Sequence, residues 1–201
     1  MAYNRFPVEQ YATLELNQVA FPKTGMVVSQ VPLGAKFVEG GSGNYGVCEN
    51  GMWVVADKAA GAINAPAAVD AKPIGIVYTT EKEYDIFHYG LKTFGRKIAG
   101  DYPRVGVLGI GDTVTTNCLQ YSTAVFADDA ALDTYLKGDL TSAPAYVIID
   151  VTNSNGNTAI PGVPAIVKAL PQNYAGAYGR IVKYYTVPNG EKGVKYQMIR
   201  V

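Results

Sequence analysis

Apolar and polar residues alternate over short runs along most of this chain, and a period of two is typical of half-buried β-strands. The runs end at Gly, Pro, Asn or Asp, which favour turns. They include Pro73–Thr80, Ala145–Val151 and a closing pair, Gly179–Val187 and Gly193–Val201, around the turn Pro188-Asn189-Gly190. About a dozen such runs predict a mainly β domain, either a barrel or a sandwich of many short antiparallel strands.

Two turn motifs predict further hairpins. Asn50-Gly51 lies between the apolar runs Tyr45–Cys48 and Met52–Ala56, and Asn-Gly in that setting is a strong hairpin signal. Gly111-Asp112 divides the run Arg104–Thr116 in the same way, and the Asp112 side chain can hydrogen-bond to backbone close by. We therefore expect a strand, a tight turn and a paired strand at each motif.

One segment, residues 127–138, has the period of a helix. It opens with Asp at the expected N-cap, places Leu132, Tyr135 and Leu136 on one face, and ends at Lys137-Gly138. We expect one short helical insertion here, and any subdivision of the β domain would lie near residues 127–143.

The N-terminal residues 1–24 mix Tyr, Phe, Pro and polar residues without a sustained period. We expect an extended N-terminal arm that becomes ordered on another surface, followed by a β-rich domain over residues 25–201. Residues 57–72 and 152–158 are predicted to be surface loops. Pro161 and Pro164 predict that the run after them is an edge strand or an irregular one.

The charge balance of the chain argues for association with protein. Lys and Arg number 17, Asp and Glu also 17, and only 17% of residues are charged, against about 25% in an average soluble domain. A neutral surface does not steer polyanions, so nucleic acid is not an expected partner, and near-zero net charge favours association. The start MAYNRFPVEQY lacks the regions of a secretory signal, and no apolar window is long enough to span a membrane. We expect synthesis in the cytosol and no membrane partner.

Gly41–Gly46 reads G-S-G-N-Y-G and matches the dinucleotide-binding spelling G-x-G-x-x-G. Such a loop needs a helix directly after its glycines, because the helix N-terminus holds the pyrophosphate. Here the strand-forming Val47 and the turn Asn50-Gly51 follow instead. We interpret these glycines as a surface loop and predict no nucleotide cofactor.

Candidate catalytic groups are few and scattered. His88 is the single histidine, and no G-x-S-x-G nucleophile motif accompanies it. The carboxylate pairs Glu81/Glu83 and Asp128/Asp129 are explained by solvation and by helix capping. The sequence therefore predicts no catalytic residue.

The two cysteines, Cys48 and Cys118, do not have the spacing of a metal site. We expect both to be small buried hydrophobic residues, and the pattern leaves open whether they form a disulfide. No metal or other cofactor is predicted.

Tyrosine is unusually abundant, with 15 residues, and it favours strands and protein interfaces. Strand alternation predicts that Arg180, Val182 and Tyr184 face one way and that Ile181, Lys183 and Tyr185 face the other. One face would lie in the core and the other against a protein neighbour, because aromatic residues and Arg are enriched in interface cores. Nucleic-acid stacking is the less favoured alternative. The candidate interface residues are Tyr3, Phe6, Tyr11, Tyr174, Tyr178, Arg180 and Tyr184.

Over about residues 20–126 the chain resembles the small β-barrel decoration and head-fibre-base proteins of tailed-bacteriophage capsids. The resemblance is carried by the Gly-rich start, by Pro73-Ile-Gly-Ile-Val-Tyr78 and by the run V-G-V-L-G-I-G-D-T-V-T of residues 105–115, with its G-D-x-V turn. It implies no catalytic residues. It implies a virion structural protein, often trimeric, that assembles in the host cytoplasm on the outer surface of the major capsid protein shell.

Two alternatives stay open. Another virion component, such as a head–tail connector, tail tube or fibre base, would also use β-strands and symmetric contacts. From a different class, a carbohydrate-binding or hydrolase β domain could stack sugar rings on Trp53, Tyr174 and Tyr178, and would depend on His88 and Glu83.

Overall fold

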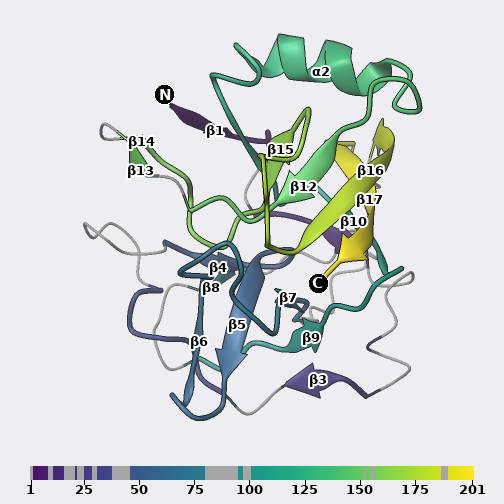
Figure 1. The fold of residues 1–201 in the computed structure, drawn as a ribbon. Coiled ribbons are helices and arrows are strands. Elements are labelled where there is room, and N and C mark those ends of the chain that lie inside the picture. The colour runs from purple at the N-terminus through teal and green to yellow at the C-terminus, as the bar shows by residue number, and fades with distance from the viewer. Residues whose placement is uncertain are drawn as a thin grey trace.

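The computed structural model forms two main β-sheets stacked on each other, with one helix at the top (Figure 1). Of residues 95–96, 153–154 and 157–158 it describes the backbone alone. The residues described are 2–8, 11–15, 21, 25–28, 31–37, 46–79, 95–96, 101–151, 153–154, 157–186 and 190–201.

The larger sheet has eight strands, and all of its neighbours are antiparallel except β11 and β15. Its spatial order is β1 (Tyr3–Arg5), β11 (Gln120–Ser122), β15 (Ala165–Val167), β12 (Tyr146–Ile148), β16 (Tyr178–Thr186), β17 (Lys192–Arg200), β10 (Thr113–Thr116) and β2 (Leu14–Glu15). The predicted closing hairpin is confirmed as β16–β17, the longest pair of the sheet.

The smaller sheet has five strands in the order β3 (Val27–Val28), β9 (Val105–Val107), β7 (Gly75–Val77), β5 (Trp53–Asp57) and β6 (Ala62–Asn64). Two separate pairs complete the strands, namely β4 (Cys48–Glu49) with β8 (Gly95–Arg96), and β13 (Asn153–Ser154) with β14 (Asn157–Thr158). The prediction of a mainly β fold is confirmed. Of the two alternatives the sandwich is correct, since the larger sheet ends at β1 and β2 and does not close on itself within the described residues.

The two sheets meet across a buried aromatic contact. Trp53 of β5 is 1% exposed and Tyr196 of β17 is fully buried, with ring centroids 6.0 Å apart. The indole Nε1 of Trp53 donates to the Tyr196 hydroxyl at 2.9 Å, which satisfies both polar groups inside the core. Burial raises the pKa of Tyr196 above its ordinary value, so this hydroxyl stays neutral.

The predicted helix is present as α2 (Asp129–Lys137). Asp128 is the N-cap, and its side chain accepts from the amide of Ala131 at 2.8 Å. Leu132 and Leu136 are each 2% exposed and turn toward the core. The helix thus closes one end of the eight-stranded sheet, above β15, β12 and β16 (Figure 1).

The N-terminal segment is extended, as predicted, but it belongs to the sheet. β1 pairs with β11, and β2 pairs with β10. Phe6 is 3% exposed, and its amide donates to the carbonyl of Leu119 at 2.9 Å. The expectation that another surface orders this arm is therefore wrong for the described residues, because strands of the same chain are its partners.

Both predicted turns exist, but neither joins a hairpin. Gly51 has φ of 92°, and the Met52 amide donates to the Glu49 carbonyl at 3.3 Å, yet β4 pairs with β8 while β5 pairs with β6 and β7. At the second turn the Asp112 side chain accepts from the Gly109 amide at 2.9 Å, as predicted. There β9 belongs to the smaller sheet and β10 to the larger, so this turn carries the chain from one sheet to the other.

The predicted loops also contain strands. Residues 57–72 include β6, which forms a hairpin with β5 through a turn at 58–61. Residues 152–158 include the short hairpin β13–β14. The run after Pro164 is β15, which is not an edge strand, since it lies between β11 and β12. Pro164 precedes the strand, so its missing N–H is not required by the ladder, and its carbonyl accepts from Gln120 at 2.9 Å.

Candidate functional site

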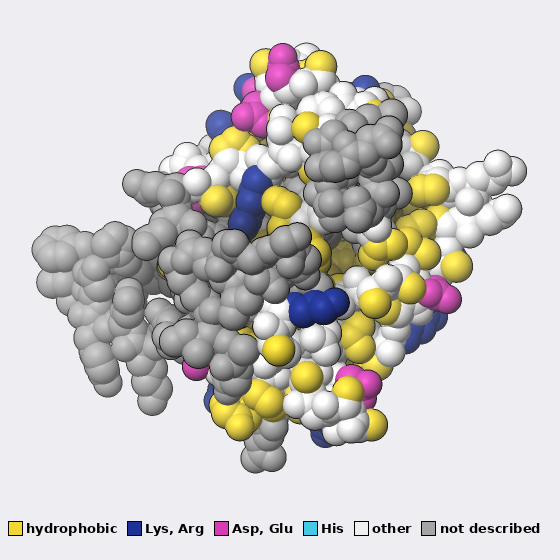
Figure 2. Space-filling view, turned by 90° about the vertical axis from the view of Figure 1, so that its left-hand side faces the viewer, with side chains coloured by type: hydrophobic (Ala, Val, Ile, Leu, Met, Phe, Trp, Pro, Cys, Tyr) yellow, Lys and Arg dark blue, Asp and Glu magenta, His cyan; other side chains and the backbone are white. Residues whose placement is uncertain are grey.

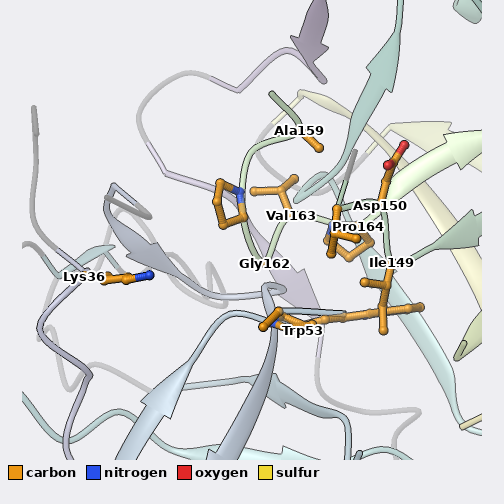
Figure 3. Close-up of a pocket in the computed structure, with 12 residues that line it drawn as sticks. Lys36, Trp53, Ile149, Asp150, Ala159, Gly162, Val163 and Pro164 are labelled. Carbon is orange, nitrogen blue, oxygen red and sulfur yellow. The ribbon is translucent and has the colours of Figure 1, made fainter. Parts of the chain in front are cut away.

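A cavity of about 350 Å³ opens between the two sheets (Figure 3). The start of β5 supplies Trp53, the segment after β12 supplies Ile149 and Asp150, and the turn before β15 supplies Gly162 and Val163. The walls are mainly apolar. Figure 3 shows the two charged lining residues on opposite sides, Lys36 on one and Asp150 on the other.

Hydrogen bonds hold this cavity in shape. The Trp53 amide donates to the Gly162 carbonyl at 2.7 Å, and Gly162 has φ of 82°, which favours glycine at this position. The Tyr3 hydroxyl donates to Asp150 Oδ2 at 2.6 Å, so the N-terminal strand holds the only carboxylate among the described lining residues. Hydrolysis of a glycosidic bond requires two facing carboxyl groups. The described lining offers one, and it is already hydrogen-bonded.

A partly buried ion pair joins Arg5 of β1 to Glu49 of β4. Arg5 Nη1 and Nη2 donate to the two oxygens of Glu49 at 2.6 and 2.7 Å, and the Ala12 amide donates to Glu49 Oε2 at 2.8 Å. The pair links β1, the chain at residue 12, and β4. Three donors from within the chain hold the carboxylate, which indicates a structural role.

Both cysteines are unpaired and fully buried, as the prediction of small buried hydrophobic residues requires. Burial raises the pKa of Cys118 to about 12, and it raises the pKa of the Cys48 thiol as well. A thiol reacts as its thiolate. Since both groups stay protonated near neutral pH, neither is a candidate nucleophile.

The aromatic residues predicted at an interface bind mostly within the chain. The Tyr174 hydroxyl has two acceptors for its one proton, the carbonyl oxygens of Ile149 and Ala177, each at 3.1 Å, and it accepts from the Ile149 amide at 2.9 Å. Burial raises the pKa of Tyr174 to about 12. The Tyr184 hydroxyl donates to Asp133 of α2, and the Tyr184 ring meets Phe6 edge to face at 6.4 Å. These side chains therefore hold the helix and the segment after β12 onto the sheet.

The remaining predicted interface residues are partly exposed. Tyr178 stacks edge to face with Tyr146 at 6.2 Å, and Arg180 Nη2 donates to the Leu140 carbonyl at 3.3 Å. Tyr3 holds Asp150, and Tyr11 is half-buried. The role of all these residues at an interface stays a prediction.

Several sequence candidates lie outside the described residues, namely His88, Glu81, Glu83 and Gly41–Tyr45. Asp128 and Asp129 are described, and both bind within the chain: Asp128 caps α2, and Asp129 accepts from the Tyr121 hydroxyl. In the described part of the chain no cluster of His, Cys, Asp or Glu could hold a metal ion. Trp53, proposed for sugar stacking, is 1% exposed and has little ring surface to offer.

The outer side of the β16–β17 hairpin is a second candidate site, which the sequence analysis did not single out as a surface. On β17 the buried Val194, Tyr196 and Met198 alternate with Lys195, Gln197 and Ile199, which point away from the core. The turn at Gly111 adds Ile110, because the Gly111 amide donates to the Met198 carbonyl at 2.8 Å. We call this surface the hairpin face, made of Ile110, Arg180, Val182, Lys183, Lys195, Gln197 and Ile199.

Two β-bulges shape the hairpin face. Ile181 pairs with Tyr196 and Lys183 pairs with Lys195, so Val182 is an extra residue on β16. Gly179 pairs with Met198 and Tyr178 with Arg200, so Ile199 is an extra residue on β17. A bulge re-aims its side chain. Val182 is 49% exposed, Ile199 40% and Ile110 73%, which makes them three of the most exposed large aliphatic residues of the described chain.

The first bulge corrects the predicted alternation. Ile181 is buried and Val182 exposed, but Tyr184, three residues after Ile181, returns to the core side with Ile181. Lys183 lies beside Val182 on the outer side, opposite Lys195. Arg180 and Tyr184 therefore do not share one surface, since the extra residue shifts the phase of the strand by one.

Comparison with protein-family models, with curated proteins and with solved structures finds no match for this chain. Within the described ranges no helix has the length and apolarity that crossing a bilayer requires.

Proposed function

We propose that this chain is a structural component of a tailed-phage virion, and specifically a capsid decoration protein that binds the outer surface of the major capsid protein shell. It acts by docking on other proteins, and no reaction is part of the proposal. The resemblance of residues 20–126 to decoration and head-fibre-base proteins supports the virion assignment, together with the neutral charge balance of the chain.

The observation that carries the proposal is the hairpin face. Isolated exposed aliphatic residues are ordinary on protein surfaces. Here two bulges on one hairpin turn the side chains of Val182 and Ile199 toward solvent. On the same hairpin Lys183 and Lys195 lie opposite each other, so two positive charges face across the strand pair. Like charges directly across a strand pair destabilise the sheet. A surface that is locally unfavourable in the isolated chain is explained by a partner that covers it.

The same features suit other positions in a virion, such as a head–tail connector, tail tube or fibre base, because those also assemble through repeated β-sheet surfaces. Symmetric repetition multiplies weak contacts into stable attachment. The carbohydrate-binding or hydrolase alternative gains little from the described residues, since Trp53 is buried and the cavity lining has one engaged carboxylate.

The test is to locate the protein in particles. Virions of the phage that encodes the chain would be purified, analysed by quantitative mass spectrometry, and imaged by cryo-electron microscopy. We expect the chain in a simple ratio to the major capsid protein, as density on the outer shell. His88→Ala and Glu83→Gln should leave this incorporation unchanged. Its absence from purified virions would overturn the proposal, and density at the tail would move the chain to another virion position.

A further inference from the structure

We propose that the cavity between the two sheets binds one amphipathic carboxylate, a straight alkyl chain that ends in a carboxyl group. The alkyl chain lies against the apolar floor of the cavity, and the carboxylate meets Lys36 at the rim. This site goes beyond the proposed function, because the cavity and the hairpin face share no residue.

The cavity has a buried floor and an exposed rim. Trp53, Ile149 and Val163 line it and are all buried, whereas Lys36 and Ala67 line it and are exposed. Its volume of about 350 Å³ lies at the lower end of the range of about 300–1,000 Å³ that is typical of small-molecule sites. The cavity therefore suits one small ligand that enters from the rim.

The polar backbone groups of the floor are largely engaged within the chain. The Trp53 amide donates to the Gly162 carbonyl at 2.7 Å. Gln120 donates twice, from its side-chain Nε2 to the Val163 carbonyl at 2.5 Å and from its amide to the Pro164 carbonyl at 2.9 Å. A polar group buried without a hydrogen-bond partner is costly. The part of a ligand that reaches this floor is therefore apolar.

Two charged side chains line the cavity, and together they favour an anionic ligand end. Figure 3 shows the ammonium group of Lys36 turned toward the other lining residues, from the side opposite Asp150. An ammonium group has three N–H donors, so Lys36 can bind a ligand carboxylate in addition to contacts within the chain. Asp150 already accepts from the Tyr3 hydroxyl at 2.6 Å. An alkyl chain with one carboxylate thus matches both the floor and the rim.

Isothermal titration calorimetry of the full chain with decanoate tests the proposal. Trp53 fluorescence reports on the same site, because Trp53 is the only tryptophan and lines the cavity. We expect one decanoate per chain. Octanoate, shorter by two methylenes, should bind about 15-fold more weakly, since each buried methylene contributes about fourfold. Decanol and decylamine should bind about tenfold more weakly than decanoate, because neither forms the charge-assisted hydrogen bond to an ammonium group.

Two variants separate the rim from the floor. Lys36→Met keeps the apolar stem, so it should weaken decanoate about tenfold and leave decanol unchanged. Ala67→Phe places a ring at the exposed mouth and should weaken both ligands. Lys58→Met and Ala60→Phe make the same changes at exposed positions of the β5–β6 turn, and they should alter neither ligand. Thermal melts check that all four variants are folded.

Three results would overturn the proposal. The first is no binding of decanoate below the concentration at which it forms micelles. The second is tighter binding of decylamine than of decanoate, since Asp150 would then select the ligand. The third is decanoate binding that is unchanged in Ala67→Phe, because the acid would then bind at another surface. None of them bears on the proposed function, which the location of the chain in virions tests separately.

Discussion

Removal of the Arg5 guanidinium should destabilise the whole domain, because this side chain ties the N-terminal strand to β4. Arg5 donates twice to Glu49, whose side chain is only 5% exposed. In Arg5→Ala the Glu49 carboxylate keeps the Ala12 amide as its remaining donor in the described part of the chain. A carboxylate held away from water without its counter-charge is costly.

The size of the effect follows from burial. Breaking a buried ion pair by removing one partner costs about 3–5 kcal/mol. The Arg5 side chain is 26% exposed, so water screens the pair in part, and we expect a loss of about 2–4 kcal/mol in the free energy of unfolding. At about 2–4 °C per kcal/mol for a chain of this size, the melting temperature should fall by about 5–15 °C.

Urea unfolding followed by the fluorescence of Trp53 measures this loss, because Trp53 is the only tryptophan and is buried between the sheets. Lys58→Ala, which removes an exposed cation from the β5–β6 turn, is the control and should change stability by less than about 0.5 kcal/mol. Replacing both partners by Leu should cost less than Arg5→Ala alone. If Arg5→Ala matches the Lys58 control, the N-terminal strand does not contribute to stability in the way described above.

Three further predictions concern backbone conformation and burial. Gly51→Ala should cost about 2–4 kcal/mol, because φ is 92° and a Cβ would lie 2.5 Å from the Cβ of Cys118. Gly111 has the same φ, but no atom lies within 4 Å of a Cβ added there, so Gly111→Ala should cost about 1–2 kcal/mol in the same urea assay. Equal losses for the two variants would contradict the steric clash inferred at Gly51. Burial raises the pKa of Tyr174 and of Tyr185 to about 12, from about 10 when unfolded. The neutral forms are favoured on folding, so stability should be complete below about pH 10 and fall up to about pH 12, measured by urea midpoints across that range. A flat profile would refute the burial of these hydroxyls. Neither thiol should react with a disulfide reagent in the native protein, and both should react in denaturant; fast native labelling would contradict their burial.

Elements whose determinants are local in the sequence were predictable. Helix α2 has its cap, its apolar face and its terminating glycine within about a dozen residues, and the structure places them at Asp128, Leu132, Leu136 and Gly138 as expected. The β16–β17 hairpin was predictable for the same reason. Pairing between strands that are not joined by a short turn was not predictable. Asn50-Gly51 is a turn, but the strands on its two sides do not pair with each other. The chain passes there from the β4–β8 pair to the five-stranded sheet, in which β5 pairs with β7.

The candidate surface depended on a feature that strand alternation cannot show. A bulge adds one residue and inverts the phase of everything after it. The pattern therefore placed Tyr184 with Arg180, whereas Tyr184 packs inward against Phe6 and Lys183 lies outside. The abundance of tyrosine was interpreted as a sign of a protein interface. The hydroxyls of Tyr174 and Tyr184 instead donate to the Ile149 carbonyl and to Asp133 of α2 within the same chain.

The position of the first strands in the larger sheet has a consequence for how the protein is made. Asn4 of β1 bonds to Tyr121, 117 residues later in the chain, and Thr13, next to β2, bonds to Asn117, 104 residues later. A ribosome adds about 5–20 residues per second, so the N-terminal strands wait for several seconds or more before their partners emerge. We expect chains stalled on the ribosome before residue 120 to lose their N-terminus to brief proteolysis, and released chains to keep it. Completion of this sheet is thus a post-translational event, and its edges are closed by the part of the chain that was synthesised first.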